Sequence, residues 1–394
     1  MKTPYFIIDE IKLAKNIESF RLALNNYWPN SRLAYSVNTN SLPWLLKYMR
    51  RAGVMAEVVS DEEYQLALMA DYSERDVIFN GPIKSSNYLI KGITNGAITN
   101  LDSYNDLDRV VACKLVQSGT IGVRVNIDTD IFETGEVEYV KEGSRFGFSD
   151  ESGELSNVIK KLEALYGPNS FGLHIHCNSV TRSIAVYKQI AAYALRIIRK
   201  HNIKPTFIDI GGGFFGGVEG KPSADDYISA ITTILSTELD ISNVKLFIEP
   251  GSAIIGSPID YCCSVLDVKD TKLSRIVTID GSRLHVDPLW KKKSYLFSTS
   301  SDKHHDFEGT QIVCGFTCMD HDRLMSVNDI SELSVGDLIT FHRVGAYSVT
   351  LSGPFIQYYP DVYFKKENGE IIKIRERMTV DQFYNIQFLE GNNL

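Results

Sequence analysis

The sequence predicts an α/β fold, a (β/α)8 barrel of the TIM type followed by a C-terminal all-β domain. From about Arg32, eight short apolar runs alternate with longer amphipathic stretches, which is typical of repeated βα units around a parallel sheet. After Gly256 the chain changes to β-branched and aromatic runs broken by Gly, Asp and Asn, which indicates a separate sheet. We expect an N-terminal strand segment at residues 1–27 that joins the β-domain, the barrel at 28–255 and the β-domain at 256–394.

The expected barrel strands are short, apolar and followed by polar or glycine-rich turns. They are Leu33–Val37, Ala56–Val59, Val77–Phe79, Ala97–Leu101, Ile121–Val125, Phe171–His176, Phe207–Ile210 and Leu246–Ile248. Helices are expected where apolar residues recur at helical spacing, as in Leu42–Arg51, Glu62–Met69, Ser152–Leu165, Ser183–Lys200 and Ala224–Ser236. The C-terminal strands include Arg275–Ile279, Gln311–Val313, Leu338–Arg343, Val362–Phe364 and Ile371–Ile374. The opening segment Tyr5–Asp9 is also strand-like and is expected to pair with this C-terminal sheet.

Composition and charge restrict the class of function. The 394 residues are 44% hydrophobic, which is enough for a large core and a smaller second one. A net charge of −8 without any Lys/Arg-rich run argues against nucleic acid or an anionic membrane as partner and favours a small-molecule site. No apolar run is long enough to span a bilayer, so we expect a cytoplasmic protein. The six cysteines have no metal-ligand spacing, so we expect reduced thiols and no metal.

Three consecutive glycines follow the expected strand Phe207–Ile210. Gly211, Gly212 and Gly213 can adopt backbone angles that are closed to other residues, so their N–H groups can converge on an anionic oxygen. This pattern is typical of a phosphate-binding loop, although a tight turn that lets strand and helix pack explains it equally well.

Other expected strands end in side chains that could carry chemistry, as the C-terminal mouth of such a barrel requires. His174 and His176 lie on one side of their strand, and Ser179 offers a hydroxyl just beyond it. The two histidines could ligate a metal, but no third ligand is evident, and a pair of hydrogen-bonded core imidazoles is favoured. Glu249 ends the last strand and needs a partner once buried, which would be either the protonated ring nitrogen of a cofactor or Arg124.

Glycines for a phosphate, an imidazole for a ring face and a carboxylate for a ring nitrogen together indicate a pyridoxal phosphate pocket. Over nearly its whole length the chain resembles the ornithine/diaminopimelate decarboxylase family, the fold-type III pyridoxal phosphate enzymes. The matching stretches are Thr3–Tyr5, Tyr35–Asn40, Val58–Glu63, Gly143–Gly147, His174–Ser179, Asp209–Phe214, Glu249–Gly251, Gly315–Cys318 and Gly345–Tyr347. The resemblance implies an alanine racemase/decarboxylase-like fold and a lyase of amino-acid metabolism that removes carbon dioxide from an α-amino acid, free or carried on a larger molecule. It also implies a homodimer with shared active sites.

The resemblance also implies roles for individual residues of the pocket. His176 would stack on the pyridine ring, Glu249 would hold its nitrogen, and Arg124 would belong to the same cofactor site. The phosphate would be held by Ser179, the backbone of Gly211, Gly212 and Gly213, and Tyr347.

Three further residues match family positions at the dimer interface. Cys318 matches the cysteine that reaches the neighbouring subunit's cofactor and acts as an acid, although a buried small thiol is the commoner role of a cysteine. Arg145 and Asp322 match a basic and an acidic residue that pair between the subunits in the family.

The family's Schiff-base lysine is missing. It follows the first barrel strand in a Tyr-x-x-Lys-x-Asn setting, where this chain has Asn38. An asparagine amide is not nucleophilic and cannot form an imine, and Lys47 and Lys84 are poor substitutes. We therefore expect a pyridoxal-phosphate-dependent decarboxylase that is inactive as written. Either an original lysine was replaced, which the otherwise intact pocket favours, or the chain is a natural pseudoenzyme that binds a ligand or regulates a catalytic paralogue.

Two other departures concern the substrate, whose identity and α-carbon stereochemistry stay open. Ser252 replaces the usual arginine after Glu-Pro-Gly, and Met319 replaces the acid that follows the cysteine. An unpaired distal ammonium in a pocket costs about 1–3 kcal/mol, which disfavours plain ornithine and lysine. The cation-rich stretch Arg283–Lys293 could meet a distal acid or phosphate, but a solvated basic loop is favoured. A racemase fits less well, because the Cys318 segment resembles the decarboxylase branch.

Overall fold

The computed structural model describes residues 1–394 except 114–119, 139–141, 293, 301–306, 329 and 388–394. The chain divides into two compact units. The barrel unit is Lys15–Ile254, and the sheet unit combines Met1–Ala14 with Ile255–Leu394. The sequence placed the first boundary at residue 27, whereas the division falls inside helix α1 (Glu10–Tyr27), so that most of this helix belongs to the barrel unit.

The barrel unit is a closed parallel barrel of eight strands, which confirms the predicted fold class. The strands are β2 (Ser31–Ser36), β3 (Met55–Val58), β4 (Val77–Phe79), β5 (Ile98–Leu101), β6 (Thr120–Asn126), β8 (Phe171–His174), β9 (Phe207–Asp209) and β10 (Lys245–Ile248). They are hydrogen-bonded in the order β5-β4-β3-β2-β10-β9-β8-β6, and pairing of β5 with β6 closes the ring. A short strand, β7 (Phe148–Ser149), pairs in parallel with the end of β6. Each predicted strand differs from the observed one by at most two residues at either end.

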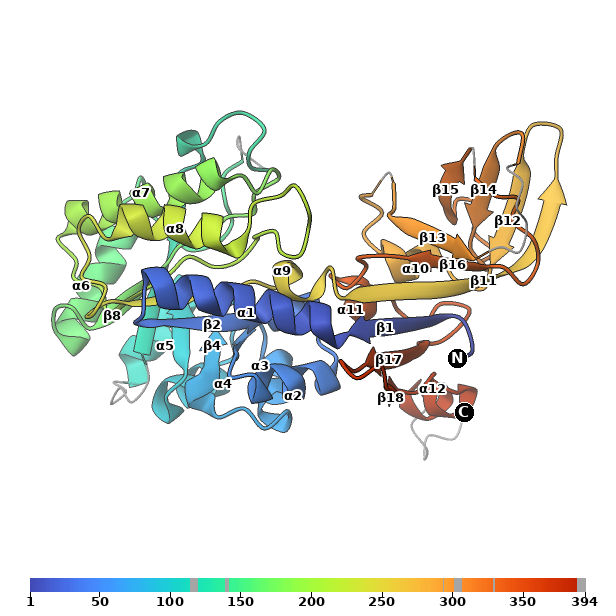
Figure 1. Ribbon diagram of the computed structural model, residues 1–394. Coiled ribbons are helices and arrows are strands. Elements are labelled where there is room, and N and C mark those ends of the chain that lie inside the picture. The colour runs from blue at the N-terminus through green and yellow to red at the C-terminus, as the bar shows by residue number, and fades with distance from the viewer. Residues whose placement is uncertain (114–119, 139–141, 293, 301–306, 329, 388–394) are drawn as a thin grey trace. The chain divides into compact units, whose positions relative to one another are not determined.

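Helices surround this ring of strands in the ribbon (Figure 1). They are α2 (Pro43–Arg51), α3 (Asp61–Met69), α4 (Ser86–Asn95), α5 (Tyr104–Cys113), α6 (Glu154–Tyr166), α7 (Ile184–His201), α8 (Ala224–Leu235) and α9 (Ser252–Ile255), with 3-10 turns η1 (Val37–Thr39), η2 (Glu74–Asp76) and η3 (Thr129–Ile131). Several start at serine side chains that accept a hydrogen bond from the first turn, as Ser60 does for α3 and Ser183 for α7. Helix α8 has a full capping box between Ser223 and Asp226.

Glycines inside two strands make the barrel interior possible. Phe207 lies in a buried cluster with Ala34, Met55, Ile78, Ile98 and Phe247. A Cβ atom at Gly172 would lie 2.3 Å from the Phe207 ring, and one at Gly122 would lie 2.7 Å from it. The large ring can therefore fill the barrel only because its neighbours on β8 and β6 carry no side chain.

The sheet unit is built around strand β1 (Tyr5–Asp9). This strand pairs antiparallel with β11 (Ile259–Asp270) and parallel with β17 (Asp361–Lys365), which confirms the predicted pairing of the N-terminal segment with the C-terminal sheet. The other strands are β12 (Arg275–Ile279), β13 (Phe297–Ser300), β14 (Gln311–Cys314), β15 (Arg323–Val327), β16 (Leu338–Phe341) and β18 (Ile371–Arg375). The unit also contains helices α10 (Arg283–Val286), α11 (Ser348–Leu351) and α12 (Val380–Gln387), so it is mostly sheet rather than all-β.

Two sequence expectations about the whole chain can be compared with the structure. None of the helices in the described residues is long and apolar enough to cross a membrane. All six cysteines are free thiols, as expected.

Replacing Phe207 by alanine should lower the free energy of unfolding of the barrel unit by about 3–5 kcal/mol, because the ring fills the barrel core. The measurement is the urea dependence of the far-UV circular dichroism. The control is Leu22→Ala on α1, where the leucine is 53% exposed and the expected change is within about 0.5 kcal/mol. Equal losses in both variants would contradict the assigned role of Phe207.

Candidate functional site

Three ionisable side chains converge where β8, β9 and β10 end. His174 ends β8, Asp209 ends β9, and Glu249 follows β10 directly. His174 is in register with Asp209 in the parallel sheet, and Asp209 is in register with Phe247, two residues before Glu249. One nitrogen or oxygen from each of the three side chains lies within 4.8 Å of the others, and all three side chains are buried. Parallel pairing thus gathers groups that are 75 residues apart in the sequence into one cluster.

Two buried asparagines hold the carboxyl groups of this cluster. Asn80 donates its amide protons to Glu249 at 2.8 Å and to Glu57 of β3 at 3.0 Å. Asn100 donates to the Asn80 carbonyl oxygen at 2.8 Å and to Asp209 at 3.4 Å. The chain of amides fixes the position of each carboxyl group and adds no charge of its own.

The carboxyl groups retain protons because they are buried beside one another. Burial raises the pKa of Asp209 to about 7. Burial, followed by the charge of Asp209, raises the pKa of Glu249 well above its usual value. Glu57 also has a raised pKa, through burial and then through Glu249. A buried cationic group beside Glu249 would favour its ionised form, so the site is suited to receiving a protonated ring nitrogen.

The two histidines are neutral. Burial lowers the pKa of His176 to about 3, and the positive charge of Arg124 adds to the effect. Burial also lowers the pKa of His174 well below its usual value, so its 3.7 Å contact with Glu249 is not an ion pair. The rings lie nearly parallel, at 12° and with centroids 6.4 Å apart. Both nitrogens of His174 and Nδ1 of His176 are buried without a hydrogen-bond partner among the described residues, so the predicted pair of hydrogen-bonded core imidazoles is wrong.

The glycine run packs against this cluster and leaves donors free. A Cβ atom at Gly211 would lie 2.5 Å from His176 Nδ1, and one at Gly212 would lie 2.2 Å from the Glu249 carbonyl oxygen. Gly211 and Gly213 have φ values of 70° and 89°, which favour glycine. The Gly211 N–H donates to Asp209 at 2.9 Å, whereas those of Gly212 and Gly213 have no acceptor among the described residues. Close packing explains the glycines, and two N–H groups are still available to an anion.

Arg182, which the sequence analysis did not single out, places a cation beside the glycine run. Arg182 donates from its guanidinium to Ser252 Oγ at 3.3 Å, and the guanidinium lies 5.3 Å from the centroid of the Phe215 ring. Ser179 accepts a hydrogen bond from the Arg182 N–H at 2.8 Å and donates one to the Glu136 carbonyl at 3.2 Å, so its hydroxyl braces this loop. An arginine from the loop after β8 therefore reaches the position where Ser252 replaces the family's arginine.

Asn38 lies in η1, directly after β2, beside the turn that carries Glu249. Ser36 donates to the Glu249 carbonyl oxygen at 2.9 Å, and a Cβ atom at Gly251 would lie 2.0 Å from Thr39 Oγ1. The Asn38 side chain is half-buried and has no hydrogen bond to the residues that the structure describes. The family's lysine position thus falls at the edge of the carboxyl cluster, as the motif alignment requires.

Arg124 and Lys84 are engaged by carboxylates of the barrel unit. Arg124 forms an ion pair with Asp102 at 2.8 Å rather than with Glu249, so this arginine is not the carboxyl partner considered from the sequence. Lys84 is buried, donates to the Gly81 carbonyl at 2.7 Å and pairs with Asp106 at 3.0 Å. Lys47 is exposed on α2. Neither lysine is positioned to replace one at residue 38.

The remaining sequence candidates are described within their own units. In the barrel unit, Arg145 is exposed, with its guanidinium 4.3 Å from the Phe146 ring centroid. In the sheet unit, Cys318 is an exposed free thiol and Tyr347 caps α11 with a φ of 63°. Asp322 is buried and accepts hydrogen bonds from the Arg283 N–H at 2.9 Å and from the Thr317 hydroxyl at 2.7 Å, so its carboxylate is engaged inside the unit.

Sequence reasoning missed Glu57, Asn80, Asn100, Asp209 and Arg182 as parts of the site. Four of them carried a usable signal, since each is a polar residue within or directly after an apolar strand. Such a residue faces the interior or the mouth of a barrel and needs polar partners. Arg182 carried no such signal, because it lies in a loop.

Comparison with known proteins identifies the family and the fold. Residues 12–256 match the family model for the pyridoxal-binding domain of pyridoxal-dependent decarboxylases. A diaminopimelate decarboxylase of Archaeoglobus fulgidus is 26% identical over 363 residues, which cover 90% of this chain and 85% of that protein. The crystal structure of diaminopimelate decarboxylase from M. jannaschii superimposes with a TM-score of 0.87 at 20% identity, covering 99% and 93% of the two chains. The Helicobacter pylori enzyme complexed with L-lysine has a TM-score of 0.83 at 20% identity, covering 98% and 97%.

The raised pKa of Asp209 predicts a specific pH dependence. The folded chain keeps a proton that the unfolded chain releases near the ordinary aspartate pKa of about 4. Relative to Asp209→Asn, the unmodified protein should therefore lose stability as pH rises from about 4 to about 7, by up to about 1.4 kcal/mol per pH unit. Urea unfolding of the cofactor-free protein across this range measures the difference.

The control for this experiment is Asp108→Asn, since Asp108 is exposed on α5. Its stability should follow that of the unmodified protein at every pH. A constant difference between Asp209→Asn and the unmodified protein would show that the carboxyl group titrates normally.

Proposed function

The chain belongs to the pyridoxal-dependent decarboxylase family, and from this premise we propose that it binds pyridoxal 5′-phosphate at the C-terminal mouth of its barrel but is disabled as a catalyst by Asn38. The observation that carries the proposal is the cluster of buried, proton-retaining carboxyl groups around Glu249. A cluster of like charges in a core is costly, and a cationic ring nitrogen would compensate it.

In this proposal Glu249 holds the proton on the ring nitrogen of the cofactor. Bound pyridoxal phosphate supplies a ring that accepts the electron pair left behind when a carboxylate departs as carbon dioxide. Asn80 keeps Glu249 in position through a hydrogen bond. The neighbouring Asp209 has a pKa raised to about 7, so it holds its own proton below that pH. Neutral His176, held against Gly211, offers a flat face for the ring. The same donors could surround a metal ion, but the unpaired glycine N–H groups beside them favour a phosphorylated ring.

The phosphate would be held by the free N–H groups of Gly212 and Gly213 and by Arg182. Arg182 supplies the positive charge where Ser252 stands in place of the family's arginine. Ser179 supports the loop that carries Arg182, and Tyr347 is included by resemblance alone.

Asn38 explains why the chain would bind the cofactor without turning substrate over. Its amide is not a nucleophile, and neither Lys47 nor Lys84 is free to take over the role of the family's lysine. The substrate class would be an α-amino acid, as the solved relative with L-lysine suggests. The second candidate is a natural pseudoenzyme that binds a ligand or regulates a catalytic paralogue. The amide of Asn38 is equally consistent with this function, and a failure of Asn38→Lys to restore activity would favour it.

We further propose a cytoplasmic homodimer with shared active sites, as the family resemblance implies. Cys318 and Arg145 are both exposed in their units and could meet a second copy. Asp322, in contrast, already accepts two hydrogen bonds inside its own unit. A contact with Arg145 of a second copy would have to use the remaining lone pairs of its carboxylate.

Asn38→Lys should acquire a visible absorbance band with pyridoxal phosphate and release carbon dioxide from one member of a panel of α-amino acids. The physical reason is that an amine replaces a non-nucleophilic amide beside the Glu249 turn. Absorbance titration and a carbon dioxide assay measure the two effects. The control is Asn38→Met, which has comparable length but no amine and should gain neither property.

The outcomes of this experiment separate the two candidate functions. Cofactor binding by both forms with activity only in Asn38→Lys supports a disabled decarboxylase. Cofactor binding without any activity in Asn38→Lys supports the pseudoenzyme. Absence of cofactor binding in both forms refutes the proposed site.

Arg182→Met should weaken the binding of pyridoxal phosphate by about 10- to 100-fold, the range expected for a hydrogen bond to a charged group. Binding of pyridoxal, which lacks the phosphate, should not change. Equilibrium dialysis measures both affinities, and Arg199→Met on the surface of α7 is the matched control. A parallel loss for both ligands would mean that Arg182 acts only through the local fold.

A further inference from the structure

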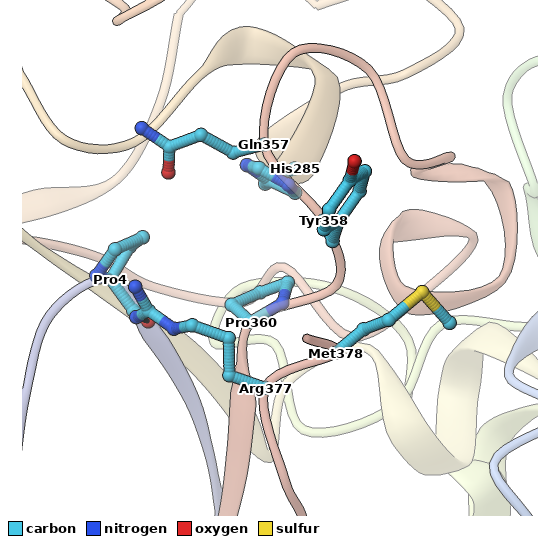
Figure 2. Close-up of a pocket in the computed structure, with 7 residues that line it drawn as sticks. All are labelled: Pro4, His285, Gln357, Tyr358, Pro360, Arg377 and Met378. Atoms are coloured by element: carbon cyan, nitrogen blue, oxygen red, sulfur yellow. Dashed lines mark hydrogen bonds between the residues drawn. The ribbon is translucent and has the colours of Figure 1, made fainter. Parts of the chain in front are cut away.

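The sheet unit contains a cavity of about 290 Å³ that takes no part in the proposed cofactor site. Figure 2 shows the side chains that line it, which are Pro4, His285, Gln357, Tyr358, Pro360, Arg377 and Met378. They come from the segment before β1, from α10, from the segment before β17 and from the segment after β18. Four separate stretches of one unit therefore build this cavity.

Arg377 gives the cavity a fixed positive charge. Its guanidinium donates to the carbonyl oxygens of Thr3 at 3.0 Å and Pro4 at 2.8 Å, which holds it in place. Its Nε is buried without a hydrogen-bond acceptor, and no carboxylate pairs with the guanidinium among the described residues. The lining includes no acidic side chain. Asp280 interacts with Arg377 electrostatically but does not line the cavity, so an anion bound in the cavity would be attracted by the guanidinium.

His285 adds a second donor. Its side chain is buried, and its Nδ1 lies 2.9 Å from the Tyr261 hydroxyl. Burial lowers the pKa of His285 to about 4, so the ring is neutral at pH 7. A bound carboxylate requires the tautomer in which Tyr261 donates to Nδ1 and the ring carries its proton on Nε2, which has no partner among the described residues.

The rest of the lining is apolar or neutral. Pro4, Pro360 and Met378 form apolar walls, and the Tyr358 ring is fixed by stacking on Phe383 of α12, with centroids 4.4 Å apart at 16°. Gln357 contributes an amide. A few polar groups within apolar walls are typical of a site for a small organic molecule, and the volume is larger than an inorganic anion needs.

We propose that this cavity is a second ligand site, which binds a small organic carboxylate. The carboxylate accepts hydrogen bonds from Arg377 and His285, and the apolar body of the ligand packs between the two prolines, Met378 and the Tyr358 ring. The inference does not depend on the proposed function, because none of the lining residues belongs to the barrel unit.

The test uses benzoate as the probe, with benzamide as its neutral analogue and inorganic phosphate as a compact anion, each titrated into the full chain by isothermal calorimetry. Benzoate should bind at least about 10-fold more tightly than benzamide, since a hydrogen bond to a charged group exceeds a neutral one. Phosphate should not compete with benzoate, whether or not it binds at the proposed cofactor site. Arg377→Gln should weaken benzoate by about 10-fold or more, whereas Arg323→Gln, an exposed arginine of the same unit, should not.

Arg377 also donates hydrogen bonds to two backbone carbonyls, so Arg377→Gln could lose binding because it misfolds. A second variant that keeps these hydrogen bonds is therefore needed. Met378→Trp fills the cavity without touching those hydrogen bonds and should abolish benzoate binding. The proposal is overturned if benzoate does not bind, if benzamide binds as tightly, if phosphate displaces benzoate, or if benzoate binding survives in Met378→Trp. Pyridoxal phosphate affinity should be unchanged in Met378→Trp, which keeps this test separate from that of the cofactor site.

Discussion

The central constraint on this protein is the burial of three carboxyl groups, Glu57, Asp209 and Glu249, at one end of a closed barrel. Like charges at such short range cannot all ionise in a low-dielectric interior, so protons are retained and amide donors are required. Asn80 and Asn100 supply the donors from neighbouring strands. A core built for packing alone would replace these groups with apolar side chains, and the proposed cationic ring nitrogen would compensate the cost of burying them.

The glycines follow from the same constraint. Gly211 and Gly212 let the backbone after β9 come close to His176 and to the Glu249 carbonyl, which a side chain would prevent. Gly122 has a corresponding role inside the barrel, since a Cβ there would lie 1.8 Å from Asn100 Oδ1. The close packing explains the glycines, and the N–H groups of Gly212 and Gly213, which have no acceptor among the described residues, fit the proposed phosphate site.

Substitutions at two family positions have different structural consequences. Ser252 is compensated, because Arg182 brings a guanidinium to the same place from another loop. Neither of the two lysines considered for Asn38 takes such a role, because Lys84 is tied to Asp106 and Lys47 is exposed. The carboxyl cluster, the Arg182 guanidinium and the amide at residue 38 are the features on which the proposed cofactor-binding, catalytically disabled form depends. The sheet unit contains a separate cavity lined by Arg377, and this cavity does not depend on the substitutions at residues 38 and 252.

The sequence by itself determined the barrel, the strand boundaries to within two residues, the sheet-rich second unit and the motif residues His176, Glu249 and Gly211–Gly213. These features depend on local periodicity and on short motifs, both of which can be recognised from residues that are close together in the sequence. Only the tertiary structure decided which partners those residues have. It paired Arg124 with Asp102 instead of Glu249 and brought Asn80, Asn100 and Arg182 to the site. It also left both nitrogens of His174 and Nδ1 of His176 without a hydrogen-bond partner among the described residues. The physical reason is that hydrogen-bond partners and pKa shifts depend on contacts across parallel strands and on burial, and neither is encoded in the spacing of residues along the sequence.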